Sequence, residues 1–281
     1  MQISHTGPVR RVQRFRPVAR AVLLAGVFAL PLGACSKAGL QDITGSIGSE
    51  ASLPRGEAAL RQHSEEWGRR YEADRTNKRA AMTYARALRA LSQHAQAVAV
   101  LQGLAIRHPR DQEVLGAYGK ALAEAGQFRQ AAEVLQNAHT PERPNWSILS
   151  TQGTVADQMG DHAQAQRYYA AALKIRPGDP TILSNYGLSY ALARNLPQAE
   201  ATLREAVASP GADMRVRQNL ALVLALEGKF AEAEEWSRRD LAPADAAANV
   251  ASIRRMIAQS NTWRDIQKVD RKTAGKPARD G

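Results

Sequence analysis

The sequence predicts an all-α protein built from stacked helical hairpins, and three observations support this fold class. Hydrophobic residues make up 44% of the 281 residues but aromatic residues only 5%, a composition typical of helices packed through alanine and leucine. Small residues recur with a constant period of 34 in two separate series. Apolar residues near these small residues have the spacing of one face of a helix. A repeated helical unit of 34 residues therefore explains both the small and the apolar residues.

Residues 1–34 are predicted to be a secretion signal. Arginines precede an apolar run at residues 21–30, which is shorter than the roughly 20 residues that a membrane-spanning helix needs. The run is followed by Leu32, Gly33, Ala34 and Cys35, which resemble the bacterial lipobox. The resemblance implies that Cys35 is acylated and that cleavage precedes it. The alternative is an ordinary secretory signal, which would leave a soluble periplasmic protein.

Cys35 is the only cysteine, so an internal disulfide and a thiolate metal cluster are excluded. Several acyl chains at one residue would hold the protein permanently at a membrane. Ser36, rather than Asp, follows the cysteine. Resemblance to enteric lipoproteins then implies the outer membrane, on its periplasmic face. Residues 35–54 contain glycines and serines with little helical or strand periodicity, and we expect them to form a flexible tether.

Five repeats follow the tether. They begin near Lys78, Gln112, Trp146, Pro180 and Met214, and each contains two positions that admit only a small residue. At such positions two helices can pack closely because almost no side chain separates them. The first series is Ala85, Gly119, Gly153, Gly187 and Ala221, and the second is Ala97, Ala131, Ala165, Ala199 and Ala233.

This pattern resembles the tetratricopeptide repeat (TPR), which implies a right-handed superhelix whose first helices line a concave groove. The third repeat departs from the pattern, since Gln152 stands where three of the other repeats have tyrosine, Ala156 weakens the apolar face, and Arg143 stands where proline is usual. Residues 57–73 resemble the second helix of an incomplete repeat. Residues 245–260 are predicted to cap the last repeat. The repeat domain is thus expected at 55–262, and a disordered basic tail at 263–281.

The sequence contains no pattern that predicts catalysis. It has no metalloprotease, nucleophile-elbow or phosphate-binding glycine motif. Of its six histidines, His5 lies in the predicted signal sequence and the other five are scattered among expected surface, turn and linker positions. We therefore expect no enzyme activity, metal, cofactor or small-molecule substrate. Arginines in the first twenty residues account for five of the eleven net positive charges. Since no basic stripe is interleaved with aromatic residues, we also expect no nucleic-acid partner, and protein partners remain.

The TPR resemblance places five positions of each repeat in the groove, together with an asparagine in the fourth and fifth repeats. The chemistry of these positions changes along the chain from basic through small polar to leucine. This gradient predicts a partner segment with an acidic end and an apolar end. The alternative is that the leucines pack on the capping helix and the arginines form a solvated face. The candidate binding residues are Arg79, Arg86, Arg89, Lys120, Asn185, Leu188, Leu192, Asn219, Leu222 and Leu226.

The combination of lipobox, tether, repeats and the closing stretch at 246–256 resembles the TadD family, the TPR lipoproteins of the tight-adherence (Flp) pilus machinery. The resemblance covers nearly the whole chain after residue 34. It implies a pilotin-like factor that assembles or localises the outer-membrane secretin, so the implied partners are the pilus secretin or other Tad components. A TPR scaffold lipoprotein for envelope or peptidoglycan enzymes is the alternative.

Overall fold

The computed structural model describes the backbone of residues 53–274 and the side chains of residues 53–259. Within this range it contains twelve α-helices, and its only β-type pairing is an isolated bridge between Thr140 and Arg143. The predicted signal sequence, Leu32, Gly33, Ala34, Cys35 and the tether up to residue 52 lie outside the described residues, as do residues 275–281.

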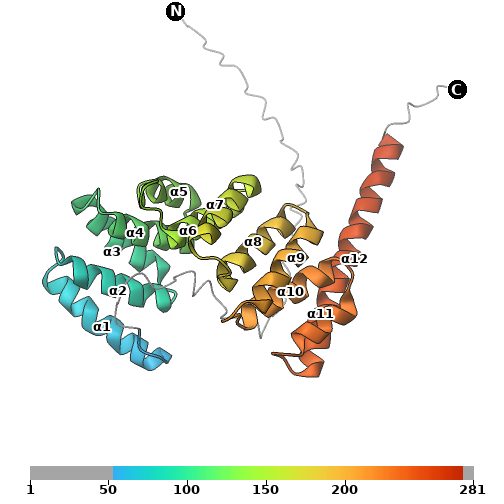
Figure 1. The fold of residues 1–281 in the computed structure, drawn as a ribbon, viewed down its shortest axis with the longest axis horizontal. Coiled ribbons are helices and arrows are strands. Elements are labelled where there is room, and N and C mark those ends of the chain that lie inside the picture. The colour runs from blue at the N-terminus through green and yellow to red at the C-terminus, as the bar shows by residue number, and fades with distance from the viewer. Residues whose placement is uncertain (1–52, 275–281) are drawn as a thin grey trace, which may run out of the picture. The chain divides into compact units, whose positions relative to one another are not determined.

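The helices follow the predicted repeats in order (Figure 1). The inner helix of each hairpin begins at the residue predicted from the repeat period, and the helix before the first repeat has the predicted bounds. The helices are α1 (Glu57–Ala73), α2 (Lys78–Ala90), α3 (His94–Arg107), α4 (Gln112–Glu124), α5 (Phe128–Gln136), α6 (Trp146–Gln158), α7 (His162–Ile175), α8 (Pro180–Leu192), α9 (Leu196–Ala208), α10 (Met214–Leu226), α11 (Phe230–Ser237) and α12 (Pro243–Ala274).

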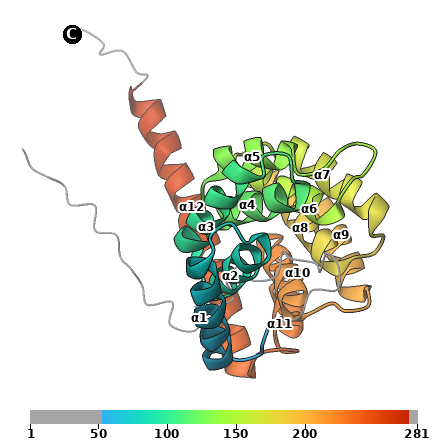
Figure 2. The same ribbon diagram turned by 90° about the vertical axis from the view of Figure 1, so that its left-hand side faces the viewer.

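Contacts between helices show which side of the stack is concave. Each of α2, α4, α6 and α8 contacts the next even-numbered helix, whereas successive odd-numbered helices in the described part of the chain do not contact each other. The even-numbered helices are therefore closer together and line the inner face. Figures 1 and 2 show the same arrangement from two sides.

The inner helices share a capping device that the repeat analysis did not use. A side-chain oxygen accepts a hydrogen bond from a backbone N–H in the first turn of each of α2, α4, α6, α8 and α10. Such a cap accepts a hydrogen bond from one of the N–H groups that have no partner within the helix, and it contributes about 1 kcal/mol to stability. The caps have the same period as the small residues, at Asn77, Asp111, Asn145, Asp179 and Asp213.

The small residues lie where the hairpin helices pack most closely. A Cβ atom added at Gly119 would lie 2.5 Å from Leu135, at Gly153 2.6 Å from the Tyr169 ring, and at Gly187 2.6 Å from Leu203. These distances are far below van der Waals contact, so a larger residue would force the two helices of a hairpin apart. The structure thus confirms the close packing predicted from the first series.

The third repeat departs from the pattern because the helix before it is short. α5 ends at Gln136, and the chain reaches α6 through a long connection. The buried Gln152 of α6 donates a hydrogen bond from Nε2 to the carbonyl oxygen of Leu135 at 3.3 Å, and its Oε1 lies 3.1 Å from His139 Nε2. Gln152 therefore adds a second hydrogen bond to the Leu135 carbonyl, which already accepts one from the backbone N–H of Ala138 at 3.2 Å.

The last helix caps the stack and continues beyond it. Ala246, Val250 and Ile253 of α12 are buried, and α12 packs against α10 and α11, as expected of the capping helix. The helix does not end near residue 262 but runs to Ala274, into the expected tail (Figure 1). Polarity suggested a tail, yet residues 261–274 contain no glycine or proline that would interrupt a helix.

Candidate protein-binding surface

At the first two repeats, a charged residue predicted for the groove is already paired. Arg89 of α2 donates two hydrogen bonds to the carboxylate of Glu124 on α4, at 2.7 and 2.6 Å. The two side chains are only 10% and 9% exposed. Arg86 is half-buried, and Arg79 is exposed with its guanidinium 5.9 Å from the centre of the Trp67 ring. Arg89 is thus engaged in joining α2 to α4.

Lys120 is buried on the inner face, with 7% of its surface exposed. Its Nζ donates a hydrogen bond to Ser147 Oγ of α6 at 2.8 Å. Burial, and then repulsion from Arg89, lower the pKa of Lys120 to about 8, against a smaller opposing effect of Glu124. Lys120 is therefore mostly charged at neutral pH and carries a desolvation cost that its hydroxyl partner offsets only in part.

Polar bonds also join the remaining inner helices. Asp157 of α6 accepts a hydrogen bond from Ser189 Oγ of α8 at 2.8 Å. Asn219 of α10 donates from Nδ2 to Ser184 Oγ of α8 at 2.9 Å. Asn185, the other predicted asparagine, is half-buried. Each successive pair of inner helices from α2 to α10 is therefore connected by at least one side-chain hydrogen bond, and several predicted groove residues hold the stack together.

The leucines at the other end of the inner face are more accessible. Leu192 is 55% exposed and Leu226 is 39% exposed, each at the last residue of its inner helix. Leu188 and Leu222 lie one turn earlier and are half-buried, and Leu222 packs against the core that includes α12. Packing against the core that includes the capping helix α12 thus accounts for Leu222, but Leu192 and Leu226 remain exposed. We call Leu188, Leu192, Leu222 and Leu226 the leucine surface.

Met256 of α12 is also 58% exposed. Arg254, two positions earlier, lies over the Phe230 ring of α11 at 5.2 Å. Because two residues turn a helix by about 200°, Met256 lies on the opposite flank of α12 from Arg254 and α11. Met256 is therefore a separate exposed apolar residue of the capping helix.

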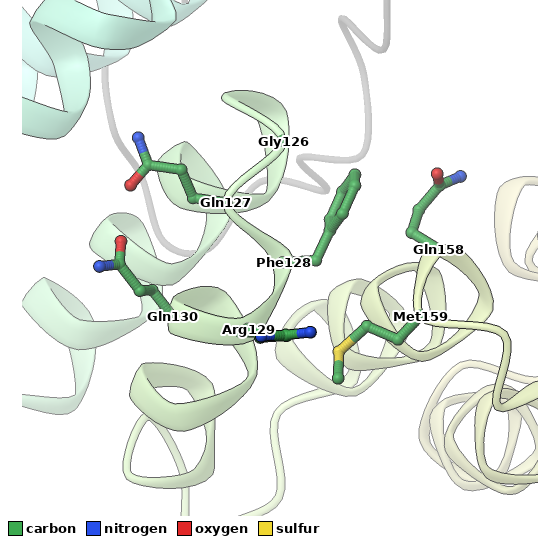
Figure 3. Close-up of a pocket in the computed structure, with 7 residues that line it drawn as sticks. All are labelled: Gly126, Gln127, Phe128, Arg129, Gln130, Gln158 and Met159. Atoms are coloured by element: carbon green, nitrogen blue, oxygen red, sulfur yellow. The ribbon is translucent and has the colours of Figure 1, made fainter.

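A shallow pocket lies at the turn between α4 and α5 (Figure 3). Phe128 from α5 and Met159 from the end of α6 supply its apolar part, and Met159 is 51% exposed. Arg129 and three glutamines supply the polar part. Sequence analysis missed this pocket because its residues follow the inner helices rather than occupying groove positions. The lining residues are Gly126, Gln127, Phe128, Arg129, Gln130, Gln158 and Met159.

The histidines differ from their expected solvated state. His139 contacts Gln152, His162 Nδ1 lies 2.9 Å from Asp157 Oδ1, and His94 Nδ1 lies 3.6 Å from Glu124 Oε2. All three are half-buried; His94 and His162 take part in polar contacts between helices, and His139 joins the connection after α5 to α6. Among residues 53–259 no group of three or more His, Cys, Asp or Glu side chains is arranged to hold a metal ion.

None of the helices in the described part of the chain combines the length and hydrophobicity required to cross a lipid bilayer.

Comparison with known proteins supports the fold. Residues 83–144 and 150–213 match the family model of the tetratricopeptide repeat. The crystal structure of PilW, a widely conserved type IV pilus biogenesis factor, superposes with a TM-score of 0.58 at 16% identity, over 65% of this chain and 84% of that chain. A thermophilic TPR protein from Thermus thermophilus gives a TM-score of 0.55 at 22% identity, over 62% and 97%. The fold is therefore an all-α TPR stack.

No curated protein has a sequence that matches this chain significantly.

Proposed function

We propose that this protein is a TPR scaffold that binds other proteins through its leucine surface. The observation that carries the proposal is the exposure of Leu192 and Leu226 at 55% and 39% on the inner face of a TPR stack. Exposed leucines that are neighbours on successive inner helices form an apolar area that a partner can cover, and burial contributes about 25 cal/mol per Å². Helix packing and turns explain the other recurring residues, so they need no catalytic role.

The partner segment is proposed to be apolar at one end and acidic at the other. Its apolar end covers the leucine surface. Its acidic end lies toward Arg79, which is exposed at the basic end of the inner face. The polar bonds between inner helices fix the spacing of the two ends, so the stack presents them in a constant register.

The biological role is proposed to be pilotin-like assembly of the Flp (Tad) pilus secretin at the periplasmic face of the outer membrane. The TadD resemblance and the lipobox ending at Cys35 support this role. The likeness in fold to PilW, whose described role is type IV pilus biogenesis, is consistent with it. The lipid at Cys35 would keep the inner face at the membrane where a secretin is inserted.

Photo-crosslinking in intact cells tests this function. A photoreactive amino acid at Leu192 should capture the secretin, whereas the same amino acid at Ile106 should not. Ile106 is a matched control because it is 74% exposed but lies on the outer helix α3. Replacing Cys35→Ser should release the protein from the membrane fraction and remove the crosslink. Capture of peptidoglycan enzymes instead of a secretin would contradict the pilus role.

A further inference from the structure

The leucine surface continues, in the register of the repeats, to the shallow pocket at the turn between α4 and α5. Gln158, which lines that pocket, lies 34 residues before Leu192, and Leu192 lies 34 residues before Leu226. These residues end α6, α8 and α10 at the same repeat position. Because α8 contacts both α6 and α10, the three positions follow one another along one edge of the inner face.

The row ends at the pocket. The equivalent residue of α4 is Glu124, whose side chain is only 9% exposed and is paired with Arg89. On the pocket side, by contrast, Met159 directly follows Gln158 and is 51% exposed. The accessible part of this edge therefore runs from Leu226 to the pocket and no further toward α2.

The pocket combines an apolar wall with a positive charge. Phe128 of α5 and Gln158 of α6 lie on either side of it, and Met159 and Arg129 complete this part of the lining (Figure 3). Arg129 is exposed, as is Arg194 in the turn after α8, and neither forms an ion pair with a carboxylate of residues 53–259. An aliphatic side chain can thus pack between Phe128 and Met159 while a neighbouring carboxylate pairs with Arg129.

The spacing of the three positions selects the conformation of a segment that contacts all of them. Packed helices lie ~8–10 Å apart. A polyproline II helix has three residues per turn and rises ~3.1 Å per residue, so every third side chain returns to the same side after ~9.3 Å. A β-strand places residues three apart on opposite sides, and an α-helix returns to the same side after seven residues and ~10.5 Å. The polyproline II conformation therefore matches the spacing of the inner helices.

We propose that the pocket and the leucine surface together hold one partner segment in the polyproline II conformation, with an apolar residue at every third position. Two of these residues cover Leu226 and Leu192, the third enters the pocket, and an acidic residue beside the third pairs with Arg129. This inference rests on the proposed function for the leucine surface, and it adds the pocket and the conformation of the segment. The acidic end then lies toward the basic end of the inner face.

Binding of a synthetic peptide tests the match in spacing. The probe has leucine at every third position, proline between the leucines, and glutamate beside the last leucine. The control peptide has the same composition but leucine at every second position. The chain from residue 35 onward, with Cys35→Ser, should bind the probe about tenfold more tightly than the control peptide by fluorescence anisotropy. Failure to bind the probe, or equal affinity for the two peptides, would overturn the proposal.

Substitutions in the pocket test its part in binding. Met159→Asp should weaken probe binding about tenfold, whereas Met214→Asp should leave it unchanged. Met214 is a matched control because it is 48% exposed but begins α10, at the opposite edge of the inner face. Replacing the glutamate of the probe by glutamine should weaken binding to the wild type about two- to fivefold and should not affect binding to Arg129→Gln. Equal affinity of Met159→Asp and the wild type would reject the pocket.

Photo-crosslinking separates this inference from the proposed function. A photoreactive amino acid at Met159 in intact cells should capture the same secretin as one at Leu192, and one at Met214 should not. Capture at Leu192 but not at Met159 would reject the pocket and keep the leucine surface. Probe binding that Leu192→Asp with Leu226→Asp leaves unchanged would reject the leucine surface, and with it both proposals.

Discussion

The two ends of the inner face use their side chains differently. At α2 and α4, Arg89 is paired with Glu124 and Lys120 is buried against Ser147. At α8 and α10, Leu192 and Leu226 project from the ends of their helices and remain exposed. The side chains of the charged end are therefore engaged in contacts within the stack, and the apolar end is available to a partner. Repeat position alone does not distinguish these roles, since the residues at both ends occupy groove positions of their repeats.

Breaking the ion pair at the charged end should have the largest effect on stability. Arg89→Met leaves Glu124 buried without its partner and should lower the free energy of unfolding by about 3 kcal/mol. Urea denaturation measures this change. The double variant Arg89→Met with Glu124→Leu should recover most of it.

The matched control is the exposed pair between Arg61 and Glu57, whose side chains are 66% and 61% exposed. Arg61→Met should change the free energy of unfolding by less than about 0.5 kcal/mol. Similar losses in the two arginine variants would mean that the inner-face pair has no special structural role.

Lys120 should destabilise the fold at neutral pH. Its pKa is about 8 in the folded protein against an ordinary value of 10.5, so folding costs up to about 3 kcal/mol while the lysine is charged. The unfolded chain binds more protons between these values, and stability therefore rises as the pH increases from 8 to 10.5. Lys120→Met should be more stable than wild type at pH 7, with the difference shrinking toward pH 10.5. A difference independent of pH would argue against a charged, buried Lys120.

The middle of the inner face should be limited by packing rather than by charge. Gly153→Ala places a Cβ 2.6 Å from the buried Tyr169 ring and should lower the free energy of unfolding by about 2 kcal/mol. Gly103→Ala is the matched control in an outer helix, where a Cβ would meet nothing closer than 4.0 Å. It should raise stability by roughly 0.5–1 kcal/mol, because alanine has the higher helix propensity. Thermal unfolding would show whether the two substitutions act in opposite directions.

The apolar end should show the smallest change in stability. Leu192→Asp with Leu226→Asp alters side chains that are already exposed, so the free energy of unfolding should change by less than about 0.5 kcal/mol for each. Chemical denaturation would check this. A loss above about 2 kcal/mol, the size expected for truncating a core leucine, would mean that these leucines belong to the core. The contrast between the two ends would then fail.

The repeat period was sufficient to predict the fold. It located the start of every inner helix because the small contact residue, the apolar face and the turn all follow the same register. It could not predict that α5 stops early, since Gln152 looks like a weak core residue until its bond to Leu135 is seen. The apolar pattern also did not predict that α12 continues to Ala274, because the part of a helix that extends beyond the stack needs no apolar face.

The candidate site was predicted less well than the fold. Arg89 and Glu124 are far apart in sequence and meet only because α2 and α4 are neighbours on the inner face. The same holds for Asn219, which was expected to bind a ligand and instead bonds Ser184. Sequence spacing showed which residues face inward, but pairing between successive repeats determines which of them remain available.

The most direct test of the central claim is the affinity of the purified protein, lacking its lipid, for the periplasmic part of the secretin. Leu192→Asp with Leu226→Asp should weaken binding at least tenfold by titration calorimetry, and Ile106→Asp on the outer helix α3 should leave it unchanged. Equal affinity of the leucine variant and the wild type would contradict the proposed role of the leucine surface.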